Sequence, residues 1–152
     1  MLKGIDPVLT PDLLWVLAAM GHGDELAVVD RNFPASSVAR DTNSGRLLAL
    51  PGLDTTRAVA AIVELLPLDS FVDTALWHMA PVDQAGVVLP VHHEIHRVCL
   101  AAADHPIRMD AMERSAFYAA ARRCFALVHT SDDRPYACFI LKKGVVFEAR
   151  LP

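Results

Sequence analysis

The sequence predicts one α/β domain over residues 1–152, a three-layer sandwich in which a mainly parallel sheet carries helices on both faces. Short apolar runs typical of buried strands alternate along the chain with helical segments, which favours strands joined by helical crossovers. The length of 152 residues is enough for one full hydrophobic core and too short for two ordinary domains. No internal repeat or low-complexity segment interrupts this pattern.

Local signals define the elements of the first half. The first helix is expected over residues 13–20, with Thr10 as its N-cap, Pro11 at its first position and Gly21 ending it with a positive φ. Then follow a strand at 25–30, a polar loop at 31–37, a strand at 47–50, a helix at 55–66 between Asp54 and Pro67, and a strand at 74–79.

The second half continues the alternation. Its expected elements are a loop at 83–90, a helix at 90–103, a short strand or turn at 107–110, a helix at 112–123 and a strand at 125–129. A turn at 131–135 leads into a strand at 136–141 and a last strand at 145–148.

Composition excludes several classes of protein. The formal net charge of −4 and the lack of a basic cluster argue against nucleic acid as the main partner. No apolar run approaches the roughly 18 to 20 residues that a membrane span needs, and the first residues lack the apolar core of a signal peptide. We therefore expect a cytoplasmic protein without a membrane partner. Cys99, Cys124 and Cys138 are widely spaced, which indicates neither a disulfide framework nor a zinc site.

His22 is the most informative residue. It lies between Gly21 and Gly23 on the short connection from the first helix to the first strand, and Asp30 lies at the far end of that strand. A titratable imidazole on a glycine-flanked loop is well placed to meet a small molecule. On local pattern alone, His22 could equally help to cap the helix.

A cluster of histidines invites a metal interpretation. The zinc-protease pattern fails because the residue four positions after His93 is Arg97. His92 and His96 lie one helical turn apart and could share a metal, but no third ligand is evident. A solvated, polar helix face is the better interpretation, and no metal site is predicted. Glycine-rich nucleotide loops and the G-x-S-x-G elbow of hydrolases are also absent from the sequence.

Two further segments carry candidate binding residues. Arg114 and Tyr118 are four residues apart on one expected helix and share a face. Tyr136 opens a strand directly after a turn, and ligands of open α/β sheets tend to sit at strand ends. Tyr136 could therefore present its hydroxyl to a ligand, or it could be a half-buried core residue.

Several stretches of the chain match, in order, a pattern known from one family of proteins. They are residues 1–5, 9–14 and 20–25, then Asp30, residues 32–34 and 65–69, Glu113, Arg114 and residues 116–118, and finally Tyr136 and residues 140–144. Together they cover nearly the whole chain, which thus resembles the L-fucose mutarotases, a group that forms one family with the D-ribose pyranases. The motifs Gly-His-Gly-Asp-Glu at 21–25 and Leu-Lys-Lys-Gly at 141–144 look closer to the fucose branch.

The resemblance implies an enzyme that interconverts the α and β anomers, or the ring forms, of a free monosaccharide without a cofactor or metal. It implies His22 as the catalytic acid/base and Asp30 as a contact of both substrate and histidine. Arg114 and the segment Tyr136, Ala137 and Cys138 would bind substrate, and Tyr136 could provide a second proton-transfer hydroxyl. Ring-shaped homo-oligomers, often decamers, with sites near subunit interfaces are also implied.

The chain departs from the pattern of the resembling proteins at two positions, and the first concerns the substrate. Cys138 stands where the family usually has Asn, and a thiol hydrogen-bonds more weakly than an amide. Ser115 stands where a Phe is common, with an expected effect on packing. The sugar preference could therefore differ from L-fucose. The alternatives are a non-catalytic sugar-binding or transport accessory protein of the same fold, and a D-ribose pyranase.

Overall fold

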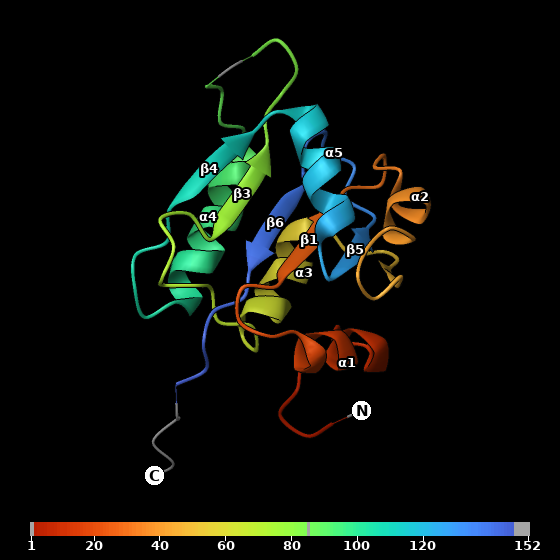
Figure 1. Ribbon diagram of the computed structural model, residues 1–152, viewed down its shortest axis with the longest axis vertical. Coiled ribbons are helices and arrows are strands. Elements are labelled where there is room, and N and C mark those ends of the chain that lie inside the picture. The colour runs from red at the N-terminus through yellow and green to blue at the C-terminus, as the bar shows by residue number, and fades with distance from the viewer. Residues whose placement is uncertain (1, 85, 148–152) are drawn as a thin grey trace.

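A six-stranded sheet in the order β2-β5-β1-β6-β3-β4 forms the centre of the molecule (Figure 1). The computed structural model describes residues 2–84 and 86–147. The strands are β1 (Glu25–Val29), β2 (Leu47–Leu50), β3 (Leu76–Met79), β4 (Met109–Met112), β5 (Ala126–Thr130) and β6 (Phe139–Lys142). Pairs β2–β5, β5–β1 and β3–β4 are parallel, whereas β6 runs antiparallel to its neighbours β1 and β3.

Helices cover both faces of this sheet. They are α1 (Pro11–Ala19), α2 (Ala35–Ala39), α3 (Thr55–Val63), α4 (Pro90–Ala102) and α5 (Arg114–Arg123). In β1, Leu26 and Val28 join the core under α1, α3 and α4, while Ala27 and Val29 join the core under α2 and α5. Figure 1 shows α5 in front of the sheet and α3 and α4 behind it. The predicted three-layer α/β class is confirmed.

Four expectations about elements are wrong. Tyr136 does not open a strand but lies in a turn, because β6 begins at Phe139. Helix α2 begins within the loop expected at 31–37 and is too short to give a readable helical period. Met112 ends β4, and the helix begins at Arg114 because the Glu113 carboxylate caps the Ser115 and Ala116 N–H groups. Residues 145–147 form no strand, since the ladder of β6 ends at Lys142 and is followed only by the isolated bridge of Lys143 with Leu68; residue 148 lies outside the described part.

The turn that carries His22 also differs from expectation. The helix ends at Ala19, and the positive φ belongs to Gly23, at +85°, rather than to Gly21. Gly21 instead donates its N–H to Asp24 Oδ2 at 2.7 Å. Because L side chains rarely adopt such a φ, Gly23 is the residue that lets the chain reverse into β1.

His92 lies in the core, so the expectation of a solvated face is wrong for this residue. It is fully buried, and its ring lies 3.9 Å, centroid to centroid, from the ring of His78 on β3. His96 also has a protein partner, since its Nε2 donates to the Ile107 carbonyl at 2.7 Å. Among residues 2–84 and 86–147, no group of three potential metal ligands is found.

Burial of His92 predicts an acid-sensitive fold. Desolvation, reinforced by nearby His78 and His93, lowers the pKa of His92 from 6.5 to about 4. The unfolded chain therefore takes up this proton first, and the free energy of unfolding falls by up to roughly 3 kcal/mol as the pH drops from about 6.5 to about 4. The pKa of His78 is also lowered by burial, although Asp110 opposes the shift, and it acts in the same direction.

Urea unfolding at pH 7.0, 5.5 and 4.5 tests this prediction, with His92→Gln as the variant that lacks the titrating group. The variant should lose less stability than the wild type over this range. Equal losses in the two proteins would contradict the assignment to His92.

Candidate functional site

His22 is paired with a buried carboxylate. Its Nε2 lies 3.1 Å from Asp69 Oδ2, and the side chain of Asp69 is 2% exposed whereas that of His22 is 47% exposed. Asp69 Oδ1 accepts the N–H of Phe71 at 3.0 Å, which fixes the carboxylate. The buried Asp69 carboxylate, which solvent does not reach, therefore orients the exposed His22 imidazole.

The residues that follow β6 hold His22 and Asp69 together, although the two are 47 positions apart in the sequence. Lys143 accepts the Gly23 N–H and donates to the Asp24 carbonyl, both at 2.8 Å. On its other side, Gly144 donates to the Pro67 carbonyl at 2.8 Å. A Cβ on Gly144 would lie 2.7 Å from the Leu68 carbonyl oxygen, so only glycine allows this close approach.

Exposed apolar side chains surround His22. The ring of Phe71 meets the imidazole edge-on at 5.6 Å between centroids, and Phe147 lies 6.5 Å from Phe71. Both phenylalanines are about two-thirds exposed, at 66% and 67%, and Val72 and Val146 are exposed beside them in sequence. Aromatic side chains exposed in this way are typical of surfaces that bind a ligand or another protein.

A second group of candidate residues lies around Asp30, which follows β1. Asp30 is buried, and its Oδ1 accepts the N–H groups of Asn32 at 2.9 Å and Phe33 at 3.1 Å. Cys138 is buried against it: burial, together with the charge of Asp30, raises the pKa of the thiol well above its ordinary value. The thiol is therefore neutral and its sulfur is no nucleophile.

Tyr118 of α5 packs beside the loop that follows Asp30. Its ring stacks on that of Phe33 at 4.9 Å between centroids. Burial raises the pKa of the Tyr118 phenol, electrostatic interactions with Cys138, Asp30 and Tyr136 raise it further, and Arg114 opposes them. The Arg114 side chain is exposed and makes no hydrogen bond to the residues that the structure describes.

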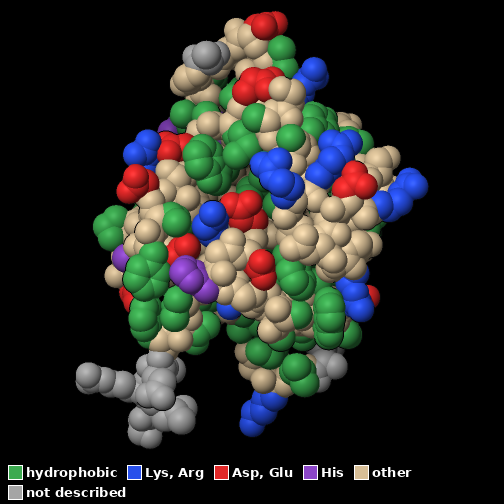
Figure 2. All heavy atoms as spheres, viewed as in Figure 1, with side chains coloured by type: hydrophobic (Ala, Val, Ile, Leu, Met, Phe, Trp, Pro, Cys, Tyr) green, Lys and Arg blue, Asp and Glu red, His purple; other side chains and the backbone are tan. Residues whose placement is uncertain are grey.

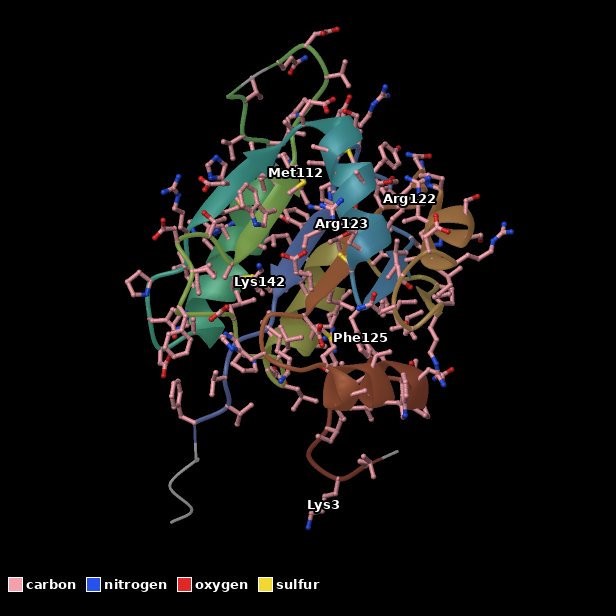
Figure 3. The ribbon with its side chains drawn as sticks, in the orientation of Figure 1. Lys3, Met112, Arg122, Arg123, Phe125 and Lys142 are labelled. Carbon is pink, nitrogen blue, oxygen red and sulfur yellow. The ribbon has the colours of Figure 1, made fainter. Side chains whose placement is uncertain are left out.

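The other arginines of α5 differ from Arg114. Arg122 Nε pairs with Asp41 Oδ2 at 3.0 Å, and Arg123 donates to the Ala119 carbonyl at 3.1 Å. Figure 3 labels both near the C-terminal end of the helix, and Figure 2 shows basic and acidic side chains interspersed on this face. Arg114 lies at the N-terminal end of α5, four residues before Tyr118.

Tyr136 presents its phenol at the same end of the sheet. The Val82 N–H donates to the phenol oxygen at 3.3 Å. Because that oxygen already accepts one hydrogen bond, the hydroxyl proton is available for a ligand. Ala137 is fully buried, and its carbonyl accepts a hydrogen bond from the Thr55 hydroxyl at 3.2 Å. Ala137 therefore contributes its backbone, and not its side chain, to the candidate site.

The structure thus divides the predicted residues between the two ends of the sheet. Asp30, Arg114, Tyr136, Ala137 and Cys138 gather where β1 and β4 end and β6 begins, the end marked by Met112 in Figure 3. His22 lies at the other end, marked by Lys142.

Within one chain, the expected contact between His22 and Asp30 is not formed. The five residues of β1 separate them by about 13 Å, counting four steps of roughly 3.3 Å, before the flanking residues are added. In this chain His22 has Asp69 as its carboxylate partner instead.

Two residues of the candidate site were not assigned a role from the sequence. Asp69 stands in the matching stretch 65–69, but nothing in its local pattern shows that it meets a histidine 47 positions away. Tyr118 had a usable signal, its i, i+4 spacing from Arg114.

No helix in the described part of the chain is long and apolar enough to cross a membrane.

Comparison with known proteins agrees with this architecture. The fucose mutarotase of Danio rerio is 40% identical over 149 residues, 96% of this chain and 95% of its own length. The crystal structure of protein Atu2016 superposes with a TM-score of 0.91 at 40% identity, covering 96% of this chain and 97% of that one. The fucose mutarotase of Streptococcus pneumoniae in complex with L-fucose gives 0.84 at 32% identity, covering 96% and 100%.

The sequence profile of the RbsD / FucU transport protein family matches residues 3–146, nearly the entire length of the chain. Profile, relatives and solved structures all agree with the resemblance noted in the sequence. The chain belongs to the RbsD / FucU family.

Proposed function

We propose that this protein is a monosaccharide mutarotase that interconverts the α and β anomers of L-fucose or a related sugar. The observation that carries the proposal is the exposed His22 imidazole oriented by the buried Asp69 carboxylate. Relatives named fucose mutarotase, at 32–40% identity over nearly the full length, support it. The reaction needs proton transfer alone, so the proposal includes no cofactor or metal.

Anomer exchange requires opening the sugar ring and closing it on the other face of the carbonyl. One group protonates the ring oxygen while another removes the proton of the anomeric hydroxyl, and the roles reverse on closure. With its Nε2–H donated to Asp69, His22 keeps Nδ1 free to accept a proton from the sugar and return it. A positioned acid/base of this kind contributes roughly 10²- to 10⁴-fold in rate.

The residues at the other end of the sheet suit the remaining tasks. Tyr136 offers a hydroxyl proton to a sugar oxygen, and the exposed Arg114 guanidinium can bind sugar hydroxyls as a fixed donor. Asp30 adds a carboxylate that accepts hydrogen bonds. Cys138 places a buried thiol beside Asp30 where the resembling proteins usually have the amide of an Asn. For this reason the proposal names the substrate as L-fucose or a related sugar.

The proposed active site is completed by a second copy of the chain. His22 and Tyr136 lie at opposite ends of one sheet, so they meet on one sugar only if His22 of one protomer faces Tyr136 of its neighbour. The exposed Phe71 and Phe147 beside His22 provide an apolar surface for that contact. We place these contacts in a ring-shaped homo-oligomer, a decamer in size, located in the cytoplasm.

Proton NMR saturation transfer with L-fucose, D-ribose and D-galactose tests the function. With catalytic amounts of protein, magnetisation should pass between the α and β anomeric protons of one sugar faster than in buffer. The sugar with the largest acceleration identifies the substrate. Thermal stabilisation by a sugar without any faster exchange would contradict the enzyme and support a sugar-binding protein instead.

A further inference from the structure

Tyr136 holds a backbone conformation that a tyrosine rarely adopts. Its φ is +63°, in the left-handed region where an L side chain crowds its own backbone. Such a conformation persists only when surrounding contacts over-determine it. The groups that hold the peptide of Tyr136 therefore set the direction of its phenol, which contacts the N–H of Val82.

A buried histidine holds that peptide. His92 Nε2 lies 3.0 Å from the Tyr136 carbonyl oxygen, and His92 Nδ1 lies 3.1 Å from the Leu89 nitrogen. The Leu89 N–H can only donate, so Nδ1 must be the unprotonated acceptor. The ring proton is therefore on Nε2, where it donates to Tyr136. Both ring nitrogens are used, and the imidazole links the start of α4 to the start of the Tyr136 segment.

Neighbouring rings pack against this imidazole. It is fully buried, lies 3.9 Å from the His78 ring and meets the edge of Phe139 at 5.7 Å between centroids. A sugar cannot reach it, so its influence on the reaction passes through Tyr136.

We propose that His92 is a positioning residue for the mutarotase reaction, because its Nε2–H fixes the left-handed peptide of Tyr136 and thereby the place of the Tyr136 hydroxyl. This inference rests on the proposed function. It assigns a task to a buried histidine that the proton-transfer steps do not use. Displacing a reacting group by about 1 Å costs up to about 100-fold in rate, which sets the scale of the expected effect.

Two substitutions separate the two hydrogen bonds of the ring. His92→Asn retains an oxygen near the position of Nδ1 and loses the donor to Tyr136, whereas His92→Gln can place its amide donor near the position of Nε2. We expect His92→Asn to lower kcat roughly 10- to 100-fold with little change in KM, and His92→Gln to recover most of that loss. His93→Asn, on the exposed neighbouring histidine of the same helix, is the matched control.

The same substitutions in a Tyr136→Phe background test the route of the effect. If His92 acts through the Tyr136 hydroxyl, His92→Asn should lower kcat little further once that hydroxyl is gone. An equal loss in both backgrounds, or a His92→Asn enzyme with wild-type kcat, would overturn the inference.

A spectroscopic measurement makes the test independent of activity. The chain has two tyrosines, so protein labelled with ¹³C at the tyrosine ζ carbon gives two signals, and Tyr136→Phe assigns them. The Tyr136 signal should move in His92→Asn and return in His92→Gln. An unmoved signal overturns the inference. A wild-type protein without anomer exchange refutes the proposed function, whereas the signal decides separately whether His92 positions Tyr136.

Discussion

Replacement of His22 by alanine is expected to lower the rate of anomer exchange by about 10²- to 10⁴-fold, the contribution of one positioned acid/base. The side chain is half exposed, and its one hydrogen bond to the described residues is to Asp69. The substitution therefore removes the proposed proton carrier without opening a cavity in the core. The melting temperature should fall only modestly, because the substitution removes one hydrogen bond to the buried Asp69 carboxylate and leaves the core packing intact.

Saturation transfer with the preferred sugar measures the loss, and His93→Ala is the matched control because His93 is an exposed histidine that belongs to neither group of site residues. Asp69→Asn should also slow exchange, because it keeps the shape of the partner and removes the charge that stabilises a protonated His22. Wild-type rates in His22→Ala would refute the central role of this residue.

Much of the fold could be predicted because its signals are local. The runs around Val28 and Val128 are apolar on both faces, as strands inside a three-layer sandwich must be, and Thr10 and Asp54 cap their helices as expected. The predictions that failed concern elements that depend on contacts between residues far apart in the sequence. The chain beyond Lys142 has the composition of a strand, but its pairing with β1 and β3 ends there, and only the isolated bridge of Lys143 with Leu68 follows in the described residues.

The site was harder to predict for the same reason. Sequence patterns pointed to His22 and Tyr136 as residues in exposed or terminal positions, but they could not show that these residues occupy opposite ends of the sheet. Asp69 reaches His22 only because the exit of β6 passes between their two segments. His92 resembled part of a polar helix face, although the helix rotates it into the core against His78.

Co-expression of two inactive variants is expected to restore activity, because the proposed site takes His22 from one subunit and Tyr136 from the next. His22→Ala and Tyr136→Phe each damage every site of their own homo-oligomer. In a randomly mixed oligomer, about a quarter of the sites combine an intact His22 with an intact Tyr136. Exchange activity should therefore rise to about a quarter of the wild-type value.

Different affinity tags on the two variants allow mixed oligomers to be isolated by tandem purification before saturation transfer is measured. A site contained within one chain gives a different result, because every copy then carries a damaged site whatever its neighbours are. Mixed oligomers with no more activity than the separate variants would therefore contradict the shared site. Restored activity would show that the two ends of the sheet, separated by the length of β1 in one protomer, face each other between protomers.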